Sequence, residues 1–111
     1  MNHRRLRCYC LLLETARVVP AITSALPRGN SYIEDQLKRA LSSAILNLAE
    51  GNGRTSIRER NRFFDISLAS ISETSAAIDI IAAYGYIRAN LEAKIREYLE
   101  RAYAMIYRLK K

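Results

Sequence analysis

Apolar residues recur every three or four positions along most of the chain, which is the period of an α-helix. Breaks in this period, rich in Gly and Pro, fall at residues 26–30, at residues 51–53 and at Gly85. They divide the chain into four segments. Four long helices with short connections favour an all-α fold, an antiparallel up-and-down four-helix bundle that forms a single domain over residues 1–111.

Two of the predicted helices begin with the same local signal. Ser31 is followed three residues later by Glu34, and Ser56 by Glu59, which is the spacing of a capping box at a helix start. For the last helix we expect Asn90 to be the N-cap.

The first segment differs because it is apolar on two sides. The face that we expect to point into the bundle consists of Leu6, Tyr9, Leu13 and Ala16. The opposite face consists of Cys8, Leu11, Val18 and Ile22. A bundle helix needs only one apolar stripe, so the second face predicts contact with a neighbouring subunit. The alternative is a short first helix followed by a buried loop.

The charge of the chain points to an anionic partner. There are 18 Lys and Arg residues against 11 Asp and Glu, a net charge of +7, and nucleic acid is the commonest partner of so basic a chain. Arg54, Arg58 and Arg62 share one outward stripe near a helix start, where mutual repulsion and the helix dipole disfavour them. We therefore expect them to bind phosphate, for which arginine is well suited, although pairing with carboxylates of another helix or subunit is the alternative. A second basic patch is the N-terminal group Arg4, Arg5 and Arg7.

Residues for catalysis or metal binding are scarce. His3 is the single histidine, and Cys8 and Cys10 are too close in sequence to bridge each other or to form a C-x-x-C pair. We therefore predict a non-enzymatic protein without metal or cofactor. The polar residues Asn47, Glu50, Ser70 and Glu73 border the inner stripes of the central helices, and we expect a buried hydrogen-bonded layer rather than a catalytic carboxylate pair. No long uncharged apolar stretch or signal peptide is apparent, so we expect a cytoplasmic protein that does not enter a membrane.

The centre of the chain resembles a known family. Asn47-Leu-Ala-Glu-Gly51 followed by Arg54 is similar to the N-x-A-E-G-x-x-R signature of a bacterial family of small four-helix proteins, often encoded by intervening sequences in large-subunit ribosomal RNA genes. Leu26-Pro27, Phe63-Phe64 and Gly85-Tyr86 agree with the same pattern. The resemblance covers residues 26–87.

This resemblance implies a homo-oligomer, a ring of five subunits, and a relationship to the accessory variability determinant of diversity-generating retroelements, which binds nucleic acid and a reverse transcriptase. It also implies that Asn47, Glu50, Gly51, Ser70 and Glu73 are structural motif residues. We therefore expect an oligomer that binds RNA or DNA backbone through its two arginine patches and accompanies a reverse transcriptase. The alternative is a protein scaffold or adaptor that does not bind nucleic acid.

Overall fold

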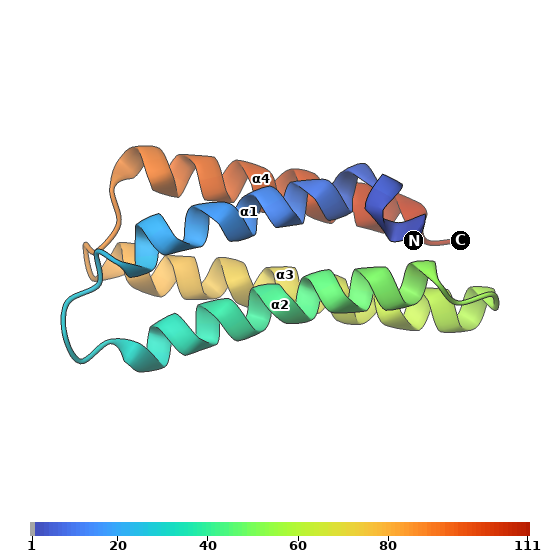
Figure 1. The fold of residues 1–111 in the computed structure, drawn as a ribbon, viewed down its shortest axis with the longest axis horizontal. Coiled ribbons are helices and arrows are strands. Elements are labelled where there is room, and N and C mark those ends of the chain that lie inside the picture. Colours follow the sequence, from blue (N-terminus) through green and yellow to red (C-terminus); the bar gives the residue numbers. More distant parts are fainter. Residues whose placement is uncertain (1) are drawn as a thin grey trace.

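The computed structural model describes residues 2–111, which form four long helices preceded by one short 3-10 helix (Figure 1). The elements are η1 (Asn2–Arg5), α1 (Arg7–Thr23), α2 (Ser31–Asn52), α3 (Ile57–Ala83) and α4 (Ala89–Leu109). No strand occurs among the residues described. The all-α prediction and the number of long helices are therefore confirmed.

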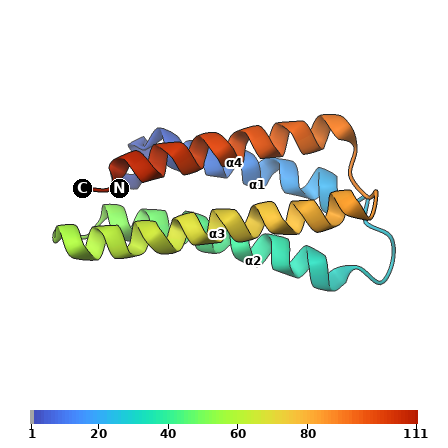
Figure 2. The same cartoon turned by 180° about the vertical axis from the view of Figure 1, so that it is seen from behind.

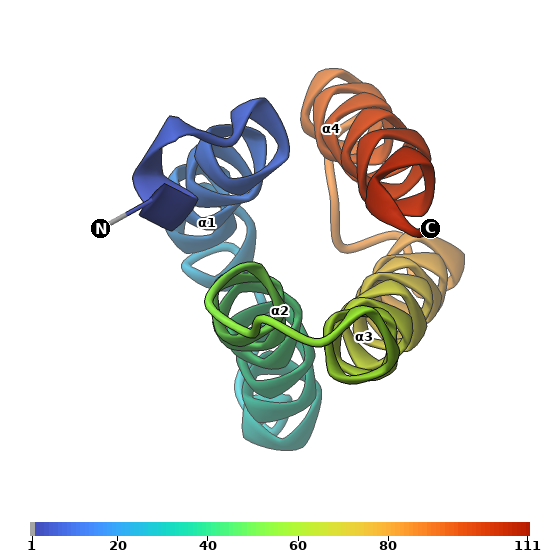
Figure 3. The ribbon, with the colours of Figure 1, turned by 90° about the vertical axis from the view of Figure 1, so that its right-hand side faces the viewer.

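The helices lie side by side in an elongated body of 45 × 23 × 22 Å. α2 packs closely on α3, and α1 packs on α4 (Figures 1 and 2). The α1–α2 and α3–α4 connections lie at one end of the body. Both termini and the α2–α3 connection lie at the other end. Viewed along the long axis, the four helices surround a central space (Figure 3) that buried side chains fill.

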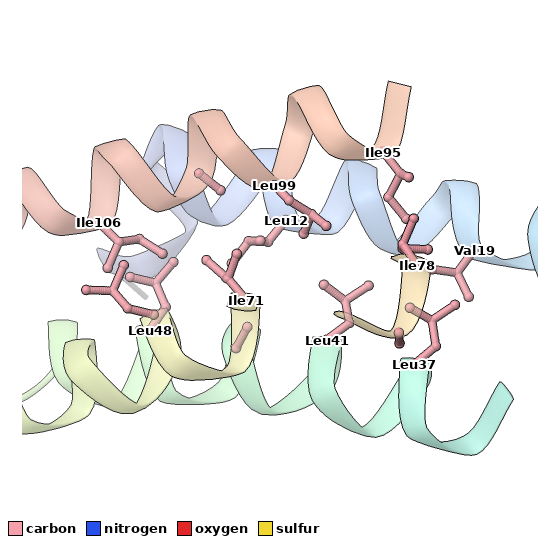
Figure 4. Packing of buried hydrophobic residues seen from close by; sticks show 14 of the residues in the cluster. Leu12, Val19, Leu37, Leu41, Leu48, Ile71, Ile78, Ile95, Leu99 and Ile106 are labelled. Atoms are coloured by element: carbon pink, nitrogen blue, oxygen red, sulfur yellow. The ribbon is translucent and has the colours of Figure 1, made fainter. Parts of the chain in front are cut away.

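Every helix contributes apolar side chains to one continuous core (Figure 4). The close-up view labels Leu12, Val19, Leu37, Leu41, Leu48, Ile71, Ile78, Ile95, Leu99 and Ile106. Burying a side chain of this size contributes about 1.5–3 kcal/mol, so this core is the main source of stability.

The face of α1 that points into the core is not the predicted one. The buried residues of α1 are Cys8, Leu12, Thr15, Val19 and Ile22. Cys8 and Ile22, which we expected at a subunit contact, are 3% and 1% exposed within the chain itself, whereas Leu11 and Val18 are only partly buried. The expected subunit face is therefore wrong for Cys8 and Ile22.

The contact between α2 and α3 is built from small residues. A Cβ atom added to Gly51 would lie 2.9 Å from two ring atoms of Phe64 and 3.0 Å from Cβ of Phe63, so only glycine allows this approach. The hydroxyl of Ser67 on α3 donates to the carbonyl of Ala44 on α2 at 2.7 Å. Close packing and this hydrogen bond together fix α2 and α3 as one unit.

The helix starts follow the sequence signals only in part. At α3 the Ser56 side chain accepts a hydrogen bond from the Glu59 backbone N–H at 3.0 Å, which confirms the predicted cap. Ser31, in contrast, is already the first residue of α2, and no side chain caps that helix. α4 begins at Ala89, one residue before the predicted N-cap Asn90.

By length and composition alone, α3 is also apolar enough to cross a membrane. The core helix of a soluble protein meets the same criterion, and α3 places its buried residues against the other helices of this fold.

Candidate nucleic-acid interface

The two predicted arginine patches lie at the same end of the molecule. This end, which we call the basic end, consists of residues 2–11, 50–65 and 101–111 and holds both termini and the α2–α3 connection (Figure 1). It carries eleven of the 18 Lys and Arg residues but three of the 11 Asp and Glu residues. The excess of positive charge in the chain is therefore concentrated at one end.

Intramolecular ion pairs reduce the mutual repulsion of the arginines in the α2–α3 region. Arg54 pairs with Glu50 at 2.7 Å and Arg62 with Glu59 at 3.1 Å. These four side chains are between 42% and 56% exposed, and each such pair contributes only about 0.3–0.5 kcal/mol. The predicted repulsion is thus partly relieved at Arg54 and Arg62. The predicted helix stripe is wrong for Arg54, because α3 begins only at Ile57. Arg58 has no carboxylate within 4.0 Å among the described residues.

Phe63 orders two of these arginines. The guanidinium carbon of Arg54 lies 5.0 Å from the centre of the Phe63 ring, and that of Arg62 lies 4.4 Å from it. Stacking of an exposed guanidinium on this half-buried ring contributes about 0.5–1 kcal/mol. Because an exposed ion pair and a ring hold each guanidinium while leaving it open to solvent, a phosphate can bind with less loss of side-chain freedom.

Arg60 belongs to the same sequence run but has a different environment. It donates to the carbonyls of Asn52 and Arg54 at 3.1 and 3.3 Å, and it lies over the Phe64 ring at 5.3 Å. These carbonyls are at the carboxyl end of α2 and just beyond it, where a cation is favourable. Arg60 therefore stabilises the α2–α3 connection.

The N-terminal patch meets arginines from α4. Arg5 and Arg7 line two adjoining surface hollows together with Arg101 and Arg108. In the sequence alone, Arg101 and Arg108 alternate with glutamates, which is typical of an ordinary solvated helix face, and about 95–100 residues separate them from Arg5 and Arg7. Among the described residues, Arg5, Arg7 and Arg108 have no carboxylate within 4.0 Å, and neither has Arg4, whereas Arg101 lies 3.5 Å from Glu97.

The C-terminal residues are attached to the start of α3. Lys110 pairs with Asp65 at 2.6 Å, and the hydrogen bond to this carboxylate raises the pKa of the Lys110 amine. Asn61 donates to the Lys111 carbonyl at 3.2 Å and accepts from the Lys111 N–H at 3.3 Å. These contacts join α4 to the α2–α3 part of the basic end.

The predicted polar motif residues separate into two groups. Asn47 donates to the carbonyl of Ser43 at 2.8 Å, and the Ser43 hydroxyl lies 2.8 Å from the hydroxyl of Ser70, which links α2 to α3. Glu50 and Glu73 are exposed, so the expected buried layer does not include them. Within residues 2–111, no group of three or more His, Cys, Asp or Glu side chains is arranged to hold a metal ion.

Comparison with known protein families gives a match, which covers nearly the whole chain. The model of the family described as 23S rRNA-intervening sequence protein matches residues 4–108, nearly the full length of the chain. No curated protein matches the sequence. The chain therefore belongs to the 23S rRNA-intervening sequence protein family.

Proposed function

We propose that this protein is a non-enzymatic oligomer that binds the backbone of RNA or DNA through its basic end. Arg54, Arg58 and Arg62 make the principal phosphate contacts. Arg4, Arg5 and Arg7 supply a second set. Because phosphates are shared by all sequences, this binding is strong at low salt and has little sequence preference.

The observation that carries the proposal is the concentration of charge at one end. The arginines of the α2–α3 region, the N-terminal arginines and the C-terminal lysines come from three separate parts of the chain, yet all lie there. A surface with so many cations and few carboxylates attracts polyanions. The family name, which refers to intervening sequences in 23S rRNA, is a loose connection to RNA and is consistent with this proposal.

We further propose that the outer face of α3 mediates self-association of the antiparallel bundles into the ring of five that the family resemblance implies. Ile66 and Ile80 on this face are 36% and 42% exposed, and Leu46 on α2 is 68% exposed. Exposed apolar residues on neighbouring helices favour contact with a second copy. Repetition of the basic end around a ring strengthens weak phosphate contacts through effective concentration.

Titration across a salt series tests the binding proposal. A fluorescent RNA hairpin and a DNA duplex are titrated at about 50 to 200 mM salt with the wild-type protein and with the Arg54→Ala/Arg58→Ala/Arg62→Ala variant. We expect affinity to fall steeply with salt. The variant should bind more weakly, and its logarithmic salt slope on the duplex should be smaller by about 0.9 for each phosphate that it no longer neutralises.

The matched control removes the same charge from elsewhere. Arg28, Arg39 and Arg88 are exposed and have no carboxylate within 4.0 Å in the described part of the chain, and Arg28 and Arg88 lie in the connections at the opposite end. Their triple Ala variant should keep the wild-type slope. An equal weakening in both variants would show that binding depends only on net charge, which contradicts a localised interface.

The alternative function is a scaffold or adaptor that holds a protein partner, such as a reverse transcriptase, without contacting nucleic acid. Absence of any complex at the lowest salt concentration favours this alternative. Light scattering after size exclusion tests the oligomer separately: we expect a mass of several subunits, and a monomer at micromolar concentration would contradict self-association.

A further inference from the structure

A trough with an apolar floor and a basic rim runs along the junction of α1 and α4. Two adjoining hollows of about 270 and 340 Å³ form it, and both are lined by Arg5, Arg7 and Met105. The trough extends along α4 from Arg101 to Leu109, a helical rise of about 12 Å. The trough thus joins an apolar surface to a positively charged one, which sets it apart from the arginine cluster of the α2–α3 region.

The floor of the trough is apolar and partly exposed. It consists of Leu6, Leu11, Met105 and Leu109, each only partly buried by the rest of the chain. Methionine is unbranched and polarisable, and such side chains adapt well to the apolar anchors of a partner. The backbone of a nucleic acid gains no binding energy from this apolar floor, because the outer surface of the backbone is charged.

The rim of the trough is positively charged. Four guanidinium groups surround it, those of Arg5, Arg7, Arg101 and Arg108, and all four side chains are exposed. Among the described lining residues the only carboxylate is Glu14, which already pairs with Arg17 at 2.8 Å. The complementary ligand therefore carries negative charge on both sides of an apolar ridge.

We propose that this trough binds an acidic amphipathic helix from a partner protein. Such a helix presents apolar side chains at positions i, i+3, i+4 and i+7, which fit a narrow floor, while its flanking carboxylates face the arginines on the rim. The length of the trough accommodates about two turns of helix. This inference does not depend on nucleic-acid binding, because it uses the apolar floor and the two α4 arginines.

A synthetic peptide provides the probe. We would use a fluorescein-labelled 14-residue peptide of Leu and Glu with the leucines on one helical face, and an isomer of the same composition with the leucines spread around the helix. Fluorescence anisotropy with the full chain should show that the amphipathic peptide binds roughly tenfold or more tightly than its isomer. Similar affinities for the two peptides, or no binding of either, would overturn the proposal.

Variants then locate the peptide. Met105→Glu should weaken binding of the amphipathic peptide roughly tenfold, whereas Met105→Leu keeps the apolar floor and should bind like the wild type. Because a glutamate at this partly buried position could disturb folding, Arg101→Glu/Arg108→Glu provides a second test on exposed side chains. Lys94→Glu, an exposed charge reversal elsewhere on α4, is its control.

Two outcomes would assign the trough to a different ligand and overturn the proposal. In one, Met105→Glu weakens binding of a 12-nucleotide RNA as much as it weakens the peptide, which makes the trough a nucleic-acid site. In the other, Met105→Glu lowers the mass of the oligomer, which makes the trough a contact between copies. Conversely, the triple Ala variant at Arg54, Arg58 and Arg62 should bind the peptide normally even when it binds RNA poorly.

Discussion

Replacing Gly51 with alanine tests the close approach of α2 and α3 beneath the arginine cluster. The added Cβ would lie 2.9 Å from the ring of Phe64, which is fully buried, and 3.0 Å from Cβ of Phe63, which moves only with the backbone. Overpacking of this kind costs about 1–3 kcal/mol. Alanine recovers less than about 1 kcal/mol through its better helix propensity.

We therefore expect Gly51→Ala to lower the free energy of unfolding by about 1–2 kcal/mol, and the melting temperature by about 4–15 °C. Circular dichroism during thermal and urea denaturation measures both quantities. The matched control is Gly53→Ala, since a Cβ at Gly53 would meet only two carbonyl oxygens at 3.6 and 3.8 Å. Its backbone has an ordinary φ of −86°, so this change should be neutral or stabilise by up to about 1 kcal/mol.

Equal stability of Gly51→Ala and Gly53→Ala would refute this explanation, because the Phe64 ring would then move aside without lowering the free energy of unfolding. A double-mutant cycle identifies the obstacle. Phe64→Leu alone destabilises the core, but it removes the ring atoms nearest to the new methyl group. The destabilisation in Gly51→Ala/Phe64→Leu should be smaller than the sum of the two single effects by about 0.5 kcal/mol or more. Additive effects would show that Phe64 is not what alanine meets.

Three further predictions concern serine and cysteine residues. Ser56→Ala removes the observed N-cap of α3 and should lower the free energy of unfolding, measured by chemical denaturation, by about 1 kcal/mol. Ser31 caps no helix, so Ser31→Ala should change this free energy by less than about 0.5 kcal/mol. A maleimide reagent should modify the exposed Cys10 faster than the buried Cys8, and peptide mass spectrometry measures both rates. Equal rates of labelling would contradict the orientation of α1. Burial raises the pKa of the Cys8 thiol above its unfolded value of about 8.5, so the folded state retains a proton that the unfolded state releases. Stability should therefore be unaffected by this thiol below pH ~8.5 and decline above it, and Cys8→Ala should lack that decline.

The number and approximate limits of the helices could be predicted because each helix has a clear apolar period and each connection contains Gly or Pro. The orientation of α1 could not. Its two opposite faces are almost equally apolar, so periodicity alone does not select between them. The stripe that enters the core includes Thr15, whose polarity argues against burial in the sequence, but its hydroxyl donates to the Leu11 carbonyl at 2.9 Å.

The candidate interface was predictable only in its parts. The arginines are visible in the sequence, but the pairing of Arg54 with Glu50 depends on the path of the chain after Gly51. α2 continues past Gly51 to Asn52, and Arg54 just beyond it lies within reach of Glu50. The trough depends on Arg5 and Arg7 meeting Arg101 and Arg108, and no local pattern connects residues so far apart in the chain.

The attachment of Lys110 and Lys111 to α3 has a practical consequence for handling this protein. An affinity tag or fluorophore fused to either terminus would lie beside the basic end and would obstruct the binding that it is meant to measure. The connection around Gly29 lies at the end of the molecule opposite the basic end. A side chain added to Gly29 would meet no atom within 4 Å, but its φ of +93° favours keeping the glycine. An internal epitope placed beside Gly29, in the loop between Pro27 and Asn30, leaves the basic end unaltered.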